Sequence, residues 1–167
     1  RGYKSADLTK PQKWTNPRTG EVISSPPKIV SDGEEIHLKA KHAGDEPYML
    51  ARNLPGVGVV VDRDRVRGGR FAVKELEADI LLLDDGLQYL GLEHSLDVVL
   101  VDQNAPFGVE YILPRGTLRE PPPNLRRADY IFLTKCDGKP NDELVRRIRK
   151  YNKEAEIMQC THGPKHL

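Results

Sequence analysis

A short apolar run that ends in two adjacent carboxylates is the feature that most constrains the fold of this chain. Residues 80–83 are all large and aliphatic, and Asp84, Asp85 and Gly86 follow directly. The run is too short for a helix, and its pattern is that of a strand buried on both faces. Such strands belong to parallel α/β sheets, where ligands bind just beyond the carboxyl ends of the strands. The sequence therefore predicts that Asp84 and Asp85 lie at the ligand-binding edge of such a sheet.

Carboxylates at that edge have a known chemistry. They can hold a magnesium ion directly or through water, as in enzymes that transfer phosphoryl groups. Gly86 would let the chain turn sharply and bring a ligand close. The other interpretation is a strand followed by a polar turn without chemistry, because Asp-Asp-Gly is a common turn sequence. These residues alone leave both interpretations open.

Composition narrows the class of protein. A chain of 167 residues fits one domain with a hydrophobic core, and its 26 basic and 25 acidic residues nearly cancel. A chain with so little net charge has no strong positive electrostatic potential that would attract nucleic acid, and no nucleic-acid partner is predicted. Two cysteines, Cys136 and Cys160, disfavour a disulfide scaffold and favour a reducing cytosol. The sequence contains no signal peptide or membrane-spanning apolar stretch, and its abrupt ends lead us to expect a fragment.

The rest of the chain predicts an α/β core preceded by a small β-ribbon. Turn signals at 16–20 and 31–33 indicate a ribbon or flap over residues 5–42. Asp45 is placed to cap a short helix that follows it. Alternating strands and helices predict a mostly parallel sheet flanked by helices over residues 44–167. The other expected elements are strands at 57–61, 96–101, 130–133 and 157–160, and helices at 64–77 and 140–151.

A long proline-rich loop, residues 104–124, interrupts this core. Loops of this length in compact domains are often functional. Prolines that hold Arg115, Arg119 and Glu120 close to strand ends would suit an anionic ligand. The alternative is a proline-stiffened surface loop with solvated charges.

Four segments taken together resemble the motifs of one family. They are Arg1-Gly2-Tyr3, Gly44-Asp45-Glu46-Pro47, Asp84-Asp85-Gly86-Leu87-Gln88 and residues 113–121. In this order they resemble tetraacyldisaccharide 4′-kinase, the lipid A 4′-kinase, over nearly the whole chain. The resemblance implies a P-loop NTPase-like α/β kinase at the cytoplasmic face of the bacterial inner membrane. It further implies transfer of the γ-phosphate of ATP, with Mg²⁺, to the 4′-hydroxyl of a tetraacylated glucosamine disaccharide 1-phosphate, which gives lipid IVA in lipid A biosynthesis.

The same resemblance implies roles for individual residues. Phosphoryl transfer depends mainly on placed charges, so the residue types are physically reasonable. Each also has a structural alternative, such as a helix cap, a solvated helix face or a flap residue. The implied roles are Asp45 as the catalytic base; Arg65, Arg119 and Glu120 as further catalytic residues; Asp84 and Asp85 as magnesium ligands; and Tyr3 and Gln88 near the substrate.

Several positions depart from the family pattern: residues 107–110 read Phe-Gly-Val-Glu where the family commonly has Gly-Asn-Gly, and Thr117 stands where proline is usual. Tyr89 stands where the family often has histidine, which puts the role of that histidine in doubt here. The family's phosphate loop is also missing, because no G-x-x-x-x-G-K-[ST] motif occurs in the 167 residues. We therefore expect the main triphosphate cradle to lie upstream of this chain, and the chain to be inactive alone.

Two other functions stay open. The segment Thr134-Lys135-Cys136-Asp137 follows a predicted strand and resembles the base-reading motif of P-loop GTPases. A GTPase-like NTPase would follow from it, and comparing ATP with GTP as phosphate donor would separate the two enzymes. A module that binds the lipid A precursor without catalysis is the second alternative, and it would bind the acylated disaccharide without nucleotide-dependent turnover.

Overall fold

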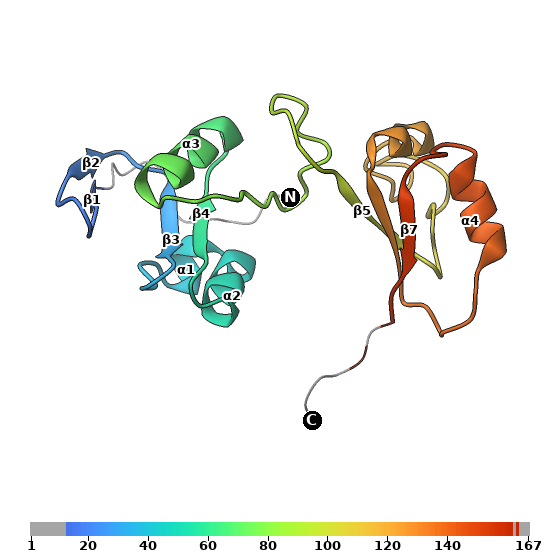
Figure 1. Cartoon of the computed structure of the whole chain (residues 1–167), viewed down its shortest axis with the longest axis horizontal. Helices are drawn as coiled ribbons and strands as arrows, with labels where there is room; N and C mark the ends of the chain where they lie inside the picture. The colour runs from blue at the N-terminus through green and yellow to red at the C-terminus, as the bar shows by residue number, and fades with distance from the viewer. Residues whose placement is uncertain (1–12, 162, 164–167) are drawn as a thin grey trace. The chain divides into compact units, whose positions relative to one another are not determined.

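The computed structural model describes residues 13–161 and 163, which fall into two compact units (Figure 1). The first unit is Arg1–Leu82 and the second is Leu83–Leu167. The predicted division at residues 5–42 and 44–167 stays a prediction. The elements of the first unit are β1 (Lys13–Thr15), β2 (Val22–Ser24), β3 (Lys28–Asp32), α1 (Ala40–Ala43), α2 (Asp45–Asn53), β4 (Gly58–Val61) and α3 (Arg65–Glu75).

An antiparallel ribbon of β3 and β4 forms the centre of the first unit, with helices on both sides (Figure 1). Because successive strand residues face opposite sides, Ile29 and Val30 enter different cores. Ile29 packs with Trp14 and with Phe71 of α3, whose rings meet edge to face with centroids 5.4 Å apart. Val30 packs with buried alanines of α1 and α2. The ribbon is therefore the layer that holds α3 apart from the pair α1–α2.

The predicted β-ribbon is only partly confirmed. The turn at 16–20 does connect the antiparallel strands β1 and β2. The turn at 31–33 instead produces a single bridge between Ser31 and Ile36, because the main partner of β3 is β4.

Helix starts follow local signals, with one correction. Asp64 caps α3 by accepting a hydrogen bond from the Arg67 backbone N–H at 3.0 Å. The prediction that Asp45 caps a helix is wrong, because Gly44 is the N-cap of α2 and Asp45 is its first helical residue. Gly44 has a φ of 101°, which is open to glycine and costly for a residue with a Cβ.

The second unit contains a parallel sheet with strand order β5-β6-β7, which confirms the predicted α/β class. The helices α4 and η1 cover one of its faces, and Ile131, Leu133, Leu144 and Ile148 form the centre of that core. The opposite face exposes Val98 and Leu100. The elements are β5 (Val98–Asp102), the 3-10 helix η1 (Pro122–Arg127), β6 (Tyr130–Thr134), α4 (Asp142–Arg149) and β7 (Glu156–Gln159).

Two predicted members of the parallel sheet are wrong. Residues 57–61 do form β4, but β4 pairs antiparallel with β3 in the first unit. Residues 80–83 form no strand, and the side chains of Ile80 and Leu82 are left exposed, at 79% and 90%. An apolar run indicates a tendency to be buried, but a strand also needs a partner for its backbone groups. In the described part of the chain, no strand pairs with residues 80–83.

Candidate functional site

Two of the sequence motifs come together in the second unit. Asp84 and Asp85 form a tight turn, and the Asp85 carboxylate Oδ2 lies 3.0 Å from Nη1 of Arg119. Both side chains of this pair are about half exposed. Gly86 is needed for the shape of the turn, because a Cβ there would lie 2.8 Å from the Cβ of Leu83. The turn therefore presents two carboxylates to solvent, one of them beside an arginine.

Glu120 has the most enclosed carboxylate of the predicted site residues in this unit. Arg127 Nη2 donates to its Oε1 at 2.9 Å and to its Oε2 at 2.7 Å, and Asn124 Nδ2 donates to Oε2 at 2.7 Å. The same Arg127 Nη2 donates to the Leu87 carbonyl at 3.0 Å. The hydrogen bonds of Glu120 thus fix the segment that carries Arg119 against the turn that carries Gln88.

Asn124 and Arg127 were missed by the sequence analysis. They stand four and seven residues after Glu120, which is the spacing of one face of an α-helix, although the structure has a 3-10 helix over Pro122–Arg127 and Glu120 precedes it. The three prolines at 121–123 obscured this signal, because prolines usually mark an irregular loop. Here two of them occupy the first positions of η1, where a missing N–H costs little.

The preceding loop is folded onto itself rather than extended into solvent. Leu113 N donates to the Leu118 carbonyl at 3.0 Å, and Leu118 N donates to the Tyr111 carbonyl at 3.2 Å. Gly116 allows this closure, because a Cβ there would lie 2.1 Å from the Tyr111 carbonyl oxygen. The Arg115 guanidinium stacks over the Tyr111 ring at 3.7 Å. Arg115 is thus occupied by an aromatic face, and the loop leads directly into Arg119 and Glu120.

The other predicted catalytic residues belong to the first unit. Asp45 and Arg65 are the first helical residues of α2 and α3. The Asp45 side chain is exposed and makes no hydrogen bond within the described residues. Arg65 is half-buried, and Tyr3 lies outside the described residues.

The donor set for a metal consists of adjacent carboxylates rather than a closed cage. Over residues 13–161 and 163, no three carboxylate, imidazole or thiol side chains gather as a metal site. Mg²⁺ commonly takes only one or two protein carboxylates, and substrate phosphates and water complete its shell. Asp84 and Asp85 fit that requirement, because both are exposed and consecutive. Glu120 fits it poorly, since protein donors engage both of its oxygens.

The segment that resembles a base-reading motif is engaged within the protein. The Lys135 ammonium at the end of β6 forms an ion pair with Asp102 at the end of β5. The hydrogen bond from Lys135 is the main reason that the pKa of Asp102 lies below its usual value. The Asp137 carboxylate accepts the backbone N–H of Lys139 at 3.0 Å. Both charged groups of this segment thus make contacts within the protein.

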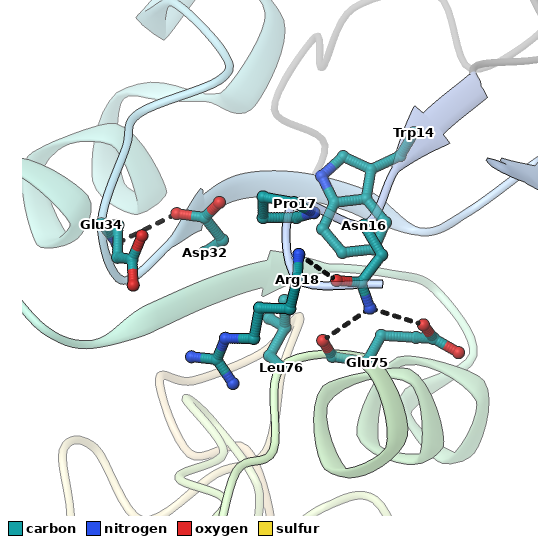
Figure 2. A pocket seen from close by; sticks show the side chains of 8 residues that line it. All are labelled: Trp14, Asn16, Pro17, Arg18, Asp32, Glu34, Glu75 and Leu76. Carbon is teal, nitrogen blue, oxygen red and sulfur yellow. Dashed lines mark hydrogen bonds between the residues drawn. The ribbon is translucent and has the colours of Figure 1, made fainter. Parts of the chain in front are cut away.

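Two hollows are lined by described residues of the first unit, and none of the predicted site residues is among those that line them. Figure 2 shows the smaller, where Asn16 donates to the backbone and side chain of Glu75. Its volume of about 10 Å³ has room for about one water molecule, so it is not a substrate site. The larger, about 480 Å³, is lined by Lys13, Trp14, Thr15, Pro26, Pro27, Ile29, His37 and Leu38. No helix of the described ranges is long and apolar enough to cross a bilayer.

Comparison with known proteins gives a consistent set of matches. The family described as LpxK, tetraacyldisaccharide-1-P 4′-kinase, matches residues 20–167. The tetraacyldisaccharide 4′-kinase of Anaeromyxobacter dehalogenans (strain 2CP-C) is 49% identical over 139 residues, which cover 82% of this chain and 37% of that protein. The protein of the same name from Geobacter metallireducens is 44% identical over 119 residues, 71% of this chain and 35% of the relative.

A solved structure is similar in fold as well. It is described as the "apo" form of LpxK from Aquifex aeolicus in complex with ATP. The match has a TM-score of 0.60 and 26% identity, and it covers 83% of this chain and 57% of that one. The chain spans roughly a third of the length of the curated relatives it matches.

Proposed function

Because this chain belongs to the tetraacyldisaccharide-1-P 4′-kinase family, we propose that the full-length protein carrying it phosphorylates an acylated glucosamine disaccharide 1-phosphate. The γ-phosphate of ATP would pass to the 4′-hydroxyl, and the product would be lipid IVA. The acceptor carries acyl chains, so we place the reaction at the cytoplasmic face of the inner membrane.

The observation that carries this proposal is the ion pair between Asp85 and Arg119. It joins two motifs that are 34 residues apart, and both are motifs whose order resembles the kinase family. An acidic turn beside an arginine is the arrangement expected around a nucleotide triphosphate with its metal. Arg119 could then interact with phosphate oxygens that gain charge during transfer.

We assign the proton acceptor to Asp45. A sugar hydroxyl is a weak nucleophile, and it loses its proton as the phosphoryl group arrives. The Asp45 side chain is exposed in the first turn of α2. Since it makes no hydrogen bond within the described part of the chain, its oxygens can accept one from a substrate hydroxyl. Arg65 and the substrate-side residues Gln88 and Tyr3 complete the proposed set.

Asp84 and Asp85 would hold the magnesium ion. Bound there, the ion would neutralise charge on the phosphate oxygens of ATP. The protein's own part is to keep the two carboxylates on a fixed turn, which Gly86 makes possible. Arg119 holds one oxygen of Asp85 and so orients that carboxylate.

Phosphate transfer by the purified full-length protein tests the proposal. With ATP, Mg²⁺ and the acylated disaccharide 1-phosphate, we expect a product phosphorylated at the 4′-position, and none when the disaccharide is omitted. Nucleotide hydrolysis with a preference for GTP and no transfer would instead indicate the GTPase-like alternative. Tight binding of the disaccharide without turnover would indicate a binding module.

The 167-residue chain alone should not catalyse this reaction. It contains no phosphate loop with a Lys-Ser/Thr pair, so it lacks the backbone cradle for the triphosphate. The same transfer assay, run with the isolated chain beside the full-length protein, measures this difference. Robust turnover by the chain alone would contradict the proposal that the reaction needs a phosphate loop that this chain does not contain.

A further inference from the structure

Arg127, which no sequence motif marks, connects several of the predicted site residues of the second unit. We propose that Arg127 is a positioning residue for phosphoryl transfer: it fixes the Glu120 carboxylate and the Asp84–Gln88 turn in one arrangement. This inference rests on the proposed function. It goes beyond that function by adding a residue and by changing the role expected of Glu120.

The first support is the number of hydrogen-bond acceptors that contact one nitrogen of Arg127. Arg127 Nη2 reaches both oxygens of Glu120 and also the carbonyl of Leu87, all within 3.0 Å. The side chains of Arg127 and Glu120 are only 27% and 17% exposed. A partly buried, charge-assisted pair keeps its geometry better than an exposed one. Arg127 therefore connects Glu120 to the backbone one residue before Gln88.

The second support is the rigidity of the element that carries Arg127. Asn152 is buried, and its Nδ2 donates to the carbonyls of Leu125 and Ala128 at 2.8 Å each. These two carbonyls flank Arg127 in the sequence. Leu125 also packs against the core that includes Ile131. The backbone at Arg127 is thus tied down on both sides, as a positioning residue requires.

The third support is that Glu120 has little capacity left for a ligand. A carboxylate offers about four lone-pair positions, and protein donors make three hydrogen bonds to this one. Asp84 and Asp85 would then be the residues that hold the magnesium ion, while Arg127 holds Glu120 in place. Arg119, the neighbour of Glu120, makes the second connection to the same turn through Asp85. Glu120 and Arg127 would thus set the direction from which Arg119 approaches the phosphates.

Substitution of Arg127 in the full-length protein tests this, and Arg126 supplies a matched control. Arg126 is its exposed neighbour in η1 and makes no hydrogen bond or ion pair among the described residues. We expect Arg127→Met to lower kcat about tenfold to a hundredfold, the range found when groups that orient a metal site are lost. Arg126→Met should leave kcat and the melting temperature unchanged.

Further readouts separate positioning from a purely structural role. Arg127→Lys keeps the charge but replaces the planar, rigid guanidinium with a compact ammonium on a flexible stem, so it should not hold Glu120 and the Leu87 carbonyl in the same geometry and should not restore kcat. In a double-mutant cycle, Glu120→Gln and Arg127→Met should each lower kcat substantially, and the double variant should have a kcat only slightly lower than that of either single variant. A structural role would instead lower the melting temperature and leave the kcat of folded enzyme unchanged.

The outcomes distinguish this inference from the proposed function. If wild type transfers phosphate and Arg127→Met has the same kcat as Arg126→Met, Arg127 is not a positioning residue. If wild type transfers no phosphate to the disaccharide, the proposed function itself fails. Should Arg127→Met not fold, Asn124→Ala removes one donor to Glu120 and leaves the Leu87 contact. We then expect a smaller, severalfold loss of kcat, and an unchanged kcat for both Asn124→Ala and Arg127→Lys would overturn the proposal.

Discussion

Two carboxylates, Asp45 in the first unit and Glu120 in the second, have opposite surroundings. Asp45 is exposed at the start of α2 and accepts no hydrogen bond within the described residues. Glu120 is mostly enclosed and accepts hydrogen bonds from Arg127 and Asn124. Asp85 lies between these extremes, with one arginine on one oxygen.

The difference teaches which carboxylates can still do chemistry. A carboxylate whose oxygens already accept hydrogen bonds from protein donors has fewer lone pairs left for a new partner. A carboxylate without donors can accept a proton or a hydroxyl hydrogen bond. On this basis we propose Asp45 for proton transfer and Glu120 for positioning, beside Asp84 and Asp85 as the proposed metal ligands.

The largest effect should come from the proposed metal ligands. In the full-length protein, Asp84→Asn and Asp85→Asn should each lower kcat by about a thousandfold, because metal-held charge contributes several kcal/mol. The Mg²⁺ concentration needed for half-maximal rate should also rise. Asp79→Asn, an exposed neighbour outside the turn, is the control for the change of charge. Near-normal rates at ordinary Mg²⁺ levels in both variants would break the assignment.

Replacing Asp45 should have the next largest effect. Asp45→Asn keeps the shape of the side chain but cannot take a proton, so kcat should fall about a hundredfold or more while ATP binding persists. Glu46→Gln removes the same charge from the same turn of α2 and should leave kcat unchanged. The loss of one charge at a helix N-terminus costs only about 0.3–1 kcal/mol of stability. A stable Asp45→Asn protein with wild-type kcat would rule out Asp45 as the catalytic base.

The smallest effect concerns the exposed pair of Asp102 and Lys135. Because Lys135 lowers the pKa of Asp102, the pair stabilises the fold above the unfolded pKa of about 3.9, and that contribution disappears as pH falls through the folded pKa. The difference in melting temperature between wild type and Asp102→Asn should therefore be small at neutral pH and vanish in acid. High salt should also reduce it. If the difference in melting temperature instead grew as the pH fell, the ion pair of Asp102 and Lys135 would not be stabilising in the way proposed.

Local structure was largely predictable from the sequence, because its causes are local. Asp64 and Asn141 cap α3 and α4 as their side-chain chemistry indicates. The three strands of the parallel sheet follow from apolar runs at 96–101, 130–133 and 157–160. Asp45 was correctly placed at a helix start, but the cap is Gly44, since backbone φ is not visible in a list of side chains.

Pairing was not predictable, because it depends on residues far apart in the chain. The apolar pattern of 57–61 is the same whether its partner is parallel or antiparallel, and β3 decides the matter. The apolar side chains of residues 80–83 likewise predict a buried strand, but the sequence does not show whether a partner strand is present, and Leu82 is exposed. Of the site, the sequence suggested Asp85 and Arg119, but only the fold shows that they meet and that Arg127 holds Glu120.

The packing of Trp14 against Phe71 has a consequence for spectroscopy. Trp14 is the one tryptophan of the sequence, and it is buried in the core of the first unit. Tryptophan fluorescence will therefore report the unfolding of the first unit and will not report the unfolding of the parallel sheet in the second unit. Far-ultraviolet circular dichroism, which averages over all backbone, will register both. Recorded together during denaturation, the two signals coincide only if both units lose structure in a single cooperative step.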